Sequence, residues 1–212
     1  MSLVYRKRRE PLLNSRRRWL CGILCGLLAG CGEQGVPVPS DRFHRLDVRT
    51  PQTVFPSPKL TGTLEVARFR ADGVLQNRAI VFVEYDSPNI MHQYHYHLWA
   101  DAPTRMLQSV TMEYLRDARL ADQVVIAGSR LDPSYTLIGD IKKLEHVVGN
   151  SSSVVVELEF GLREHKDGSV VWVKNYAADR TVKDDSVGAA TLAISESVEE
   201  ILGNLSADLA RR

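Results

Sequence analysis

Three histidines stand close together in the stretch His92-Gln-Tyr-His95-Tyr-His97 and could serve as metal ligands. Zinc binds imidazole nitrogens at about 2.0–2.1 Å. On a regular strand His95 and His97 would share one face and His92 would lie on the other. Two ligands and a distant third do not make a site, so packing within an aromatic strand is the preferred interpretation. We therefore predict no metal and no cofactor, and keep metal binding by these histidines as the alternative.

The tyrosines of the same stretch, Tyr94 and Tyr96, are candidates for binding a partner protein. Amphipathic aromatic side chains are enriched at protein–protein interfaces. If the strand is regular, Trp99 lies on the face opposite the two tyrosines. One of these sets would then be core and the other surface. We expect Trp99, at a junction with Pro103, to be structural.

Cysteine chemistry is confined to the start of the chain, at Cys21, Cys25 and Cys31. The last of them ends Leu28-Ala29-Gly30-Cys31, which resembles a bacterial lipobox. Small residues before the cysteine let a signal peptidase hold an extended backbone, and the thiol accepts diacylglycerol. The resemblance implies cleavage after Gly30 and lipidation of Cys31 as an N-acyl diacylglycerol cysteine.

The residues before Cys31 have the order of an export signal. A basic run ends at Arg18, and a 12-residue uncharged apolar stretch follows it, which is shorter than the ~20 residues of a membrane-spanning helix. The segment 15–20 also resembles a twin-arginine signal, and a plain basic start is the other possibility. Residue 32 is Gly and not the Asp that retains lipoproteins at the inner membrane, which implies sorting to the outer membrane.

Charge and missing motifs exclude several classes of function. Residues 1–18 hold seven basic residues and one acidic residue, and the rest of the chain holds 20 and 25, a net charge of −5. An acidic body does not suit nucleic-acid binding, which needs a basic surface. The sequence has no G-x-S-x-G, no H-E-x-x-H and no G-x-x-x-x-G-K-[ST]. We therefore predict a protein that is not an enzyme.

The hydrophobic pattern predicts strands, a helix, four strands and a second helix. Apolar residues recur at three- and four-residue steps over 103–120 and about 186–209, which predicts amphipathic helices capped by Asp101 and by Asp184 or Asp185. The expected strands are 60–69, 79–85, 91–99, 123–127, 135–146, 153–165 and 169–178. The fold class is α+β, a two-layer sandwich of a mostly antiparallel sheet with two amphipathic helices on one face.

We expect three segments along the chain. Residues 1–30 are the signal peptide, residues 31–43 are the lipidated cysteine and a flexible tether, and residues 44–212 are a single domain. Two glycines and two prolines in 32–42 suit a tether.

Several motifs in this order resemble the family of ABC-type transport auxiliary lipoproteins. The strand-to-helix junction 94–107 resembles the family pattern Y-x-Y-x-x-W-a-x-x-P-x-x-m-l. His44-Arg-Leu46 stands where the family opens with Tyr-x-Leu. Tyr135-Thr-Leu-Ile-Gly139 and Ser169-Val-Val-Trp172 resemble two of its strands. The resemblance covers residues 44–209.

The resemblance implies a periplasmic lipoprotein of a Gram-negative bacterium, anchored to the outer membrane by lipid. It would be a non-catalytic component of an ABC-type intermembrane lipid transport system, with an MCE-domain protein as its partner. Sheet edges and an anchor that confines copies to one plane favour a homo-oligomer. The alternative function is a periplasmic metal-binding lipoprotein that uses His92, His95 and His97.

Overall fold

The computed structural model describes residues 39–212, of which residues 40–212 form one compact unit. The predicted signal peptide, Cys31 and the tether up to residue 38 lie outside the described residues. The first strand begins at Arg42, inside the stretch predicted to be a tether. No helix in residues 39–212 is long and apolar enough to span a membrane.

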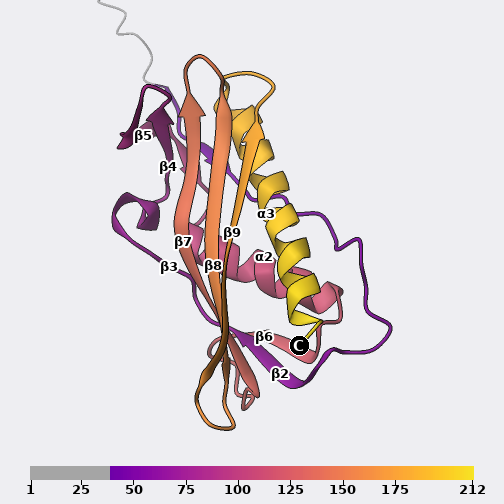
Figure 1. The fold of residues 1–212 in the computed structure, drawn as a ribbon. Helices are drawn as coiled ribbons and strands as arrows, with labels where there is room; N and C mark the ends of the chain where they lie inside the picture. Colours follow the sequence, from indigo (N-terminus) through magenta and orange to yellow (C-terminus); the bar gives the residue numbers. More distant parts are fainter. Residues whose placement is uncertain (1–38) are drawn as a thin grey trace, which may run out of the picture. The chain divides into compact units, whose positions relative to one another are not determined.

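The described chain contains nine strands, two α-helices and one 3₁₀ helix (Figure 1). In chain order they are β1 (Arg42–His44), β2 (Leu60–Val66), β3 (Arg70–Ala71), η1 (Gly73–Gln76), β4 (Ala79–Glu84), β5 (Ser87–Trp99), α2 (Pro103–Asp117), β6 (Ala121–Ile126), β7 (Tyr135–Val148), β8 (Ser153–Glu164), β9 (Val170–Thr181) and α3 (Val187–Leu209). All seven strands expected from the hydrophobic pattern are present, and β1, β3 and η1 are additional.

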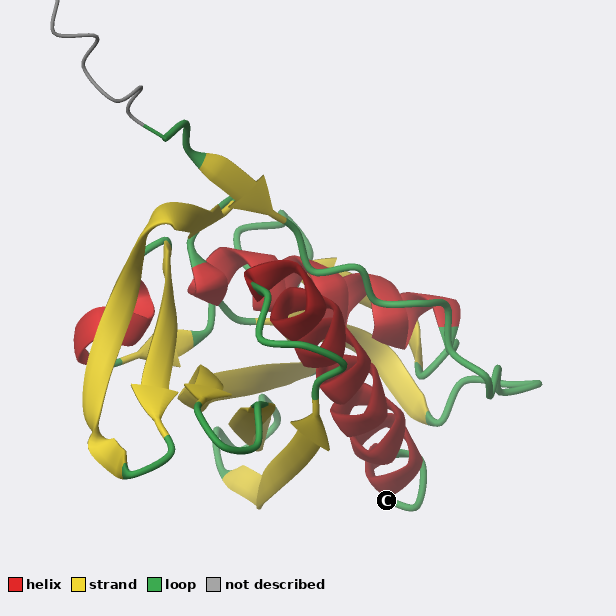
Figure 2. Ribbon diagram, turned by 90° about the horizontal axis from the view of Figure 1, so that it is seen from above, coloured by secondary structure: helices red, strands yellow, loops and turns green. Residues whose placement is uncertain are grey.

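Strand β7 organises the sheet because three strands share one of its edges. Its start pairs with β2, its middle with β3 and its end with β4, all in parallel. On its other side β8 pairs antiparallel along almost the whole strand, and β9 follows β8. Strands β6, β5 and β1 extend the sheet beyond β2 and β4 (Figure 2). The result is one curled sheet.

The expected fold class is confirmed as α+β, but the expected mostly antiparallel sheet is wrong. Five of the eight strand pairings are parallel, so the sheet is mixed. Alternating hydrophobicity shows that a strand has one buried face, but it does not show which strand lies beside it. The curled sheet does not confirm the expected two-layer sandwich.

Both helices contribute to one hydrophobic core cluster with the sheet. Helix α2 packs on β6 and β2, α3 packs on β8 and β9, and the two helices contact each other. The core includes Trp99, whose side chain is 1% exposed, and the helix residues Leu107, Leu115, Ile194 and Leu205. The structural role expected for Trp99 is confirmed by this burial.

The helix starts differ from the expected caps by one or two residues. Ser186 is the N-cap of α3, and its hydroxyl accepts a hydrogen bond from the backbone N–H of Ala189 at 3.1 Å. Asp184 only accepts from the N–H of Ser186. Helix α2 begins after Ala102, and Asp101 accepts from the N–H of Ala102. Serine is as good an N-cap as aspartate, so the sequence alone did not decide between neighbouring candidates.

Candidate partner-binding surface

The candidate residues of the His92–His97 stretch lie in β5, which forms a hairpin with β4. The pairing of the two strands is irregular: two steps along β4, from Ala79 to Val81, correspond to five steps along β5, from Leu98 to Gln93. Extra residues in one strand form a bulge, which breaks the regular alternation of side chains. The faces expected for a regular strand therefore do not hold over residues 93–98.

The bulge separates the three histidines that were considered as metal ligands. His92 stacks on Phe82, while His97 lies against Tyr94 and His44. Tyr94 also contacts Phe82, so His92 and His97 border the same aromatic cluster. The expectation that His95 and His97 share a face apart from His92 is wrong for this strand. In residues 39–212 no group of three or more His, Cys, Asp or Glu is arranged to hold a metal ion.

Two hydrogen-bonded histidine networks fill the base of this hairpin. The Tyr94 hydroxyl lies 3.0 Å from Nδ1 of the fully buried His146, whose Nε2 lies 2.8 Å from the Ser152 hydroxyl. In the second network, Nε2 of His44 lies 3.0 Å from Nδ1 of His97. One nitrogen of that pair must donate and the other accept, so the pair excludes two positive charges.

The surroundings of these rings favour their neutral forms. Burial lowers the pKa of His146, and the charge of Asp185 opposes that shift. Burial, followed by the neighbouring His97 and then Arg42, lowers the pKa of His44. The pKa of His97 is lowered by burial and by Arg42. All three groups therefore bind protons more readily in the unfolded chain, where the reference value is 6.5.

Acidification is expected to destabilise the domain through these histidines. Stability falls with pH wherever the unfolded state binds more protons, so the loss begins below about pH 6.5. We expect the melting temperature to drop between about pH 7.5 and pH 5, and His146→Gln to make this drop smaller. Thermal melts followed by circular dichroism measure both. A melting temperature that is constant over this range contradicts the assignment.

The two tyrosine candidates have different environments. Tyr94 packs against the core, and its hydroxyl is hydrogen-bonded inside the molecule. Tyr96 is 39% exposed and remains available to another molecule. The structure thus separates the pair and leaves Tyr96 as the accessible partner-binding candidate.

Further exposed apolar residues lie around Tyr96 in the fold, on β1 and on the β4–β5 hairpin. We call the set the hairpin surface: Phe43, Tyr85, Ile90, Met91 and Tyr96. Ile90 and Met91 are adjacent in β5 and are 55% and 51% exposed, so both faces of the strand are open there. The sequence analysis missed four of these residues, although consecutive apolar residues without charges in residues 87–96 were a visible signal.

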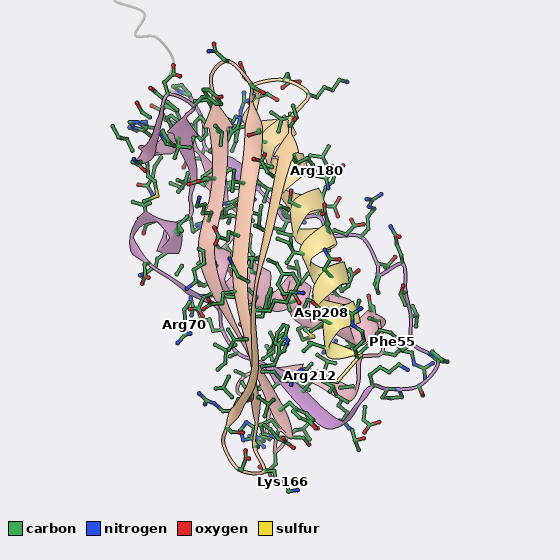
Figure 3. The ribbon with its side chains drawn as sticks, viewed as in Figure 1. Phe55, Arg70, Lys166, Arg180, Asp208 and Arg212 are labelled. Carbon is green, nitrogen blue, oxygen red and sulfur yellow. The ribbon has the colours of Figure 1, made fainter. Side chains whose placement is uncertain are left out.

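A groove of about 840 Å³ lies on α3, bordered by the segment 49–59 (Figure 3). Its lining mixes basic and acidic side chains with Phe55 and Tyr114. Arg49 pairs with Glu199 at 2.9 Å, and Arg180 pairs with Glu200 at 2.9 Å. The paired charges leave no strong field of one sign for a charged ligand. The sequence analysis missed this groove because segment 49–59 has no periodic pattern.

Comparison with known proteins identifies the relatives of this domain. The family model described as "ABC-type transport auxiliary lipoprotein component" matches residues 44–206. Protein XCC0632 from Xanthomonas campestris has a crystal structure with a TM-score of 0.68 and 20% identity, covering 78% of this chain and 92% of that one. A crystal structure of an uncharacterized protein gives a TM-score of 0.63 and 15% identity, over 80% and 99% of the two chains.

These structures share the fold of the present chain, and a search of curated proteins finds no match. The family match starts at His44, where the resemblance in the sequence begins, and extends into α3. It spans β2 to β9 and both helices, including the β4–β5 hairpin. The chain therefore belongs to the family of ABC-type transport auxiliary lipoprotein components.

Proposed function

We propose that this protein is a lipoprotein anchored through Cys31 to the periplasmic face of the outer membrane of a Gram-negative bacterium. It acts as a non-catalytic auxiliary component of an ABC-type intermembrane lipid transport system. Its partner is an MCE-domain protein of the inner-membrane complex, and copies of the chain associate into a homo-oligomer. The family match over residues 44–206, behind the lipobox-like Leu28-Ala29-Gly30-Cys31, is the observation that carries the proposal.

The exposed residues of the β4–β5 hairpin support a docking role. Scattered apolar residues are normal on a protein surface, but a hairpin that is open on both faces provides a surface for a partner. Tyr96 offers a ring with a polar hydroxyl, which is the kind of side chain that is enriched at interfaces. The family description names an auxiliary transport component and no reaction, in keeping with a role in binding.

A photoreactive phenylalanine analogue at position 96 is expected to crosslink to an MCE-domain protein in living cells. Tyr96 is accessible, and the analogue keeps an aromatic ring at the proposed contact. Leu192, which is 59% exposed on α3, is the control position. Mass spectrometry of the crosslinked bands identifies the partner. A crosslink to an MCE-domain protein at 192 only would reject the surface, and none at either position would contradict the transport role.

A further inference from the structure

Strand β5 has an outer edge that is unpaired over most of its length. Its inner edge pairs with β4, whereas β1 covers only His97, Leu98 and Trp99 on the outer side. Residues 87–96 contain no Asp, Glu, Lys or Arg. Proteins usually protect such edges with charges, bulges or covering segments, because an open edge accepts strands from other chains. Here the only such feature is the bulge at its inner end.

The other two terminal strands of the sheet are protected. The guanidinium group of Arg116 donates to the carbonyl of Val124 in β6 at 3.0 Å. Arg212 donates to the carbonyl of Val171 in β9 at 2.8 Å (Figure 3). Strand β9 also carries Lys174. Among the described residues, no side chain forms a hydrogen bond with the backbone of 87–96.

The segment before β1 is a poor cover for this edge, although it is in position to extend β1. Arg42 pairs with His97 in parallel, so continuing the same register would bring residue 39 beside Tyr94 and residue 37 beside His92. Both of these residues are proline, which has no N–H to donate to a strand. The pairing seen in the structure indeed starts at Arg42.

We propose that the outer edge of β5 pairs with the same edge of a second copy of this chain, antiparallel, about a two-fold axis near His92. Pro88 limits the pairing stretch at one end and β1 limits it at the other, so residues 89–96 of two copies fit each other. The proposal rests on the homo-oligomer part of the proposed function and not on the transport role.

Charge and chemistry favour a second copy as the occupant. An isologous contact places each patch against itself, so a charged edge would repel its own copy, and this edge has no charge. The antiparallel arrangement also brings the hairpin turn, with the exposed Glu84 and Asp86, to the start of β1 in the other copy, where the exposed Arg42 lies. Opposite charges therefore meet at both ends of the paired edge. Both faces of β5 stay free, so Tyr96 remains accessible to a different partner.

Cysteine crosslinking in whole cells tests this pairing with the full chain. The body of the chain has no cysteine after residue 31, so an introduced thiol there is unique. Cross-strand neighbours in an antiparallel pair have Cβ atoms about 4.5–5.5 Å apart, close to what a disulfide needs. We expect oxidation to give a disulfide dimer for His92→Cys. Val173→Cys in β9, at a position 60% exposed, is the matched control and should give none above wild type.

A charge at the edge provides the second arm. Met91→Lys, introduced beside His92→Cys, places like charges together across the axis and should reduce the disulfide dimer by at least about tenfold. Val173→Lys in the same background should leave it unchanged. Met91 is half exposed, so the fold should tolerate lysine, and a thermal melt of the purified variant checks this.

The outcomes separate the two levels of the proposal. An amine-reactive crosslinker applied to wild type shows whether any oligomer forms. If oligomers form but His92→Cys gives no disulfide dimer, the β5 pairing is wrong and the homo-oligomer stands. If neither reagent gives a dimer, both are wrong. A disulfide dimer that Met91→Lys does not reduce also overturns pairing at this edge.

Discussion

Cys31→Ser is expected to abolish attachment of this protein to the membrane and to leave it unprocessed or free in the periplasm. The lipobox-like Leu28-Ala29-Gly30-Cys31 predicts that the thiol of Cys31 carries diacylglycerol. Acyl chains stabilise membrane binding by about 0.8 kcal/mol per buried CH₂, so one chain is reversible while two or three form a nearly permanent anchor. Nearly all of the protein should therefore move out of the processed, membrane-bound fraction. Cell fractionation and the electrophoretic size of the protein measure the change.

Cys25→Ser is the matched control for this experiment. Cys25 lies in the apolar stretch that should be cleaved off, so its replacement should leave processing and attachment unchanged. If Cys31→Ser still runs at the mature size and fractionates with membranes, Cys31 is not the anchor. If both variants fail to be processed, the apolar stretch is sensitive to any substitution, and mass spectrometry of the wild-type amino terminus decides whether Cys31 carries acyl chains.

The elements of this fold were largely predictable because its strands and helices are strongly patterned. In β8, Val156, Leu158, Phe160 and Leu162 alternate with polar residues, and all four are buried. The predicted end of α2 was three residues late. The structure ends the helix at Asp117, and Arg119 has a φ of 57°, the left-handed conformation usual for glycine at this position. No glycine marked this end in the sequence.

Strand order and the candidate site were less predictable, because both depend on contacts between distant segments. Hydrophobic alternation in β7 does not show that β2, β3 and β4 share one of its edges. The bulge in β5 changes which faces His92 and His97 occupy, and the sequence around it contains no glycine to mark it. The pairing of His44 with His97 joins residues 53 positions apart. The sequence nevertheless located the right strand for the surface candidates.

Gly139→Ala is expected to destabilise the domain strongly, because the side chain of Phe69 occupies the space beside Gly139. A Cβ at this position would lie 2.6–2.7 Å from three atoms of the Phe69 ring. The ring is 3% exposed and packs edge-on against Phe160, the residue opposite Gly139 in β8. Because the ring is confined on these sides, it cannot move away without disturbing the core.

The expected loss for Gly139→Ala is about 3 kcal/mol of unfolding free energy, at the upper end of the usual cost of overpacking. For a domain of this size it corresponds to a fall of about 6–12 °C in melting temperature. Gly161→Ala in the neighbouring strand is the matched control, because its nearest atoms would lie 3.8 Å away. It should change stability by less than about 0.5 kcal/mol. Equal losses for the two variants would show that strand glycine is required generally and not for Phe69.

A double variant tests whether the ring itself causes the loss. Phe69→Leu alone removes part of the ring and should cost about 1–3 kcal/mol through lost packing. In the presence of Gly139→Ala, the added methyl group fills part of the space that the ring leaves, so the clash and the cavity partly cancel. The combined loss should therefore be smaller than the sum of the single losses by at least about 1 kcal/mol, a coupling expected only for residues in contact. Additive losses would instead place the effect of Gly139→Ala in the backbone of β7, where a second substitution at Phe69 has no means of relieving it.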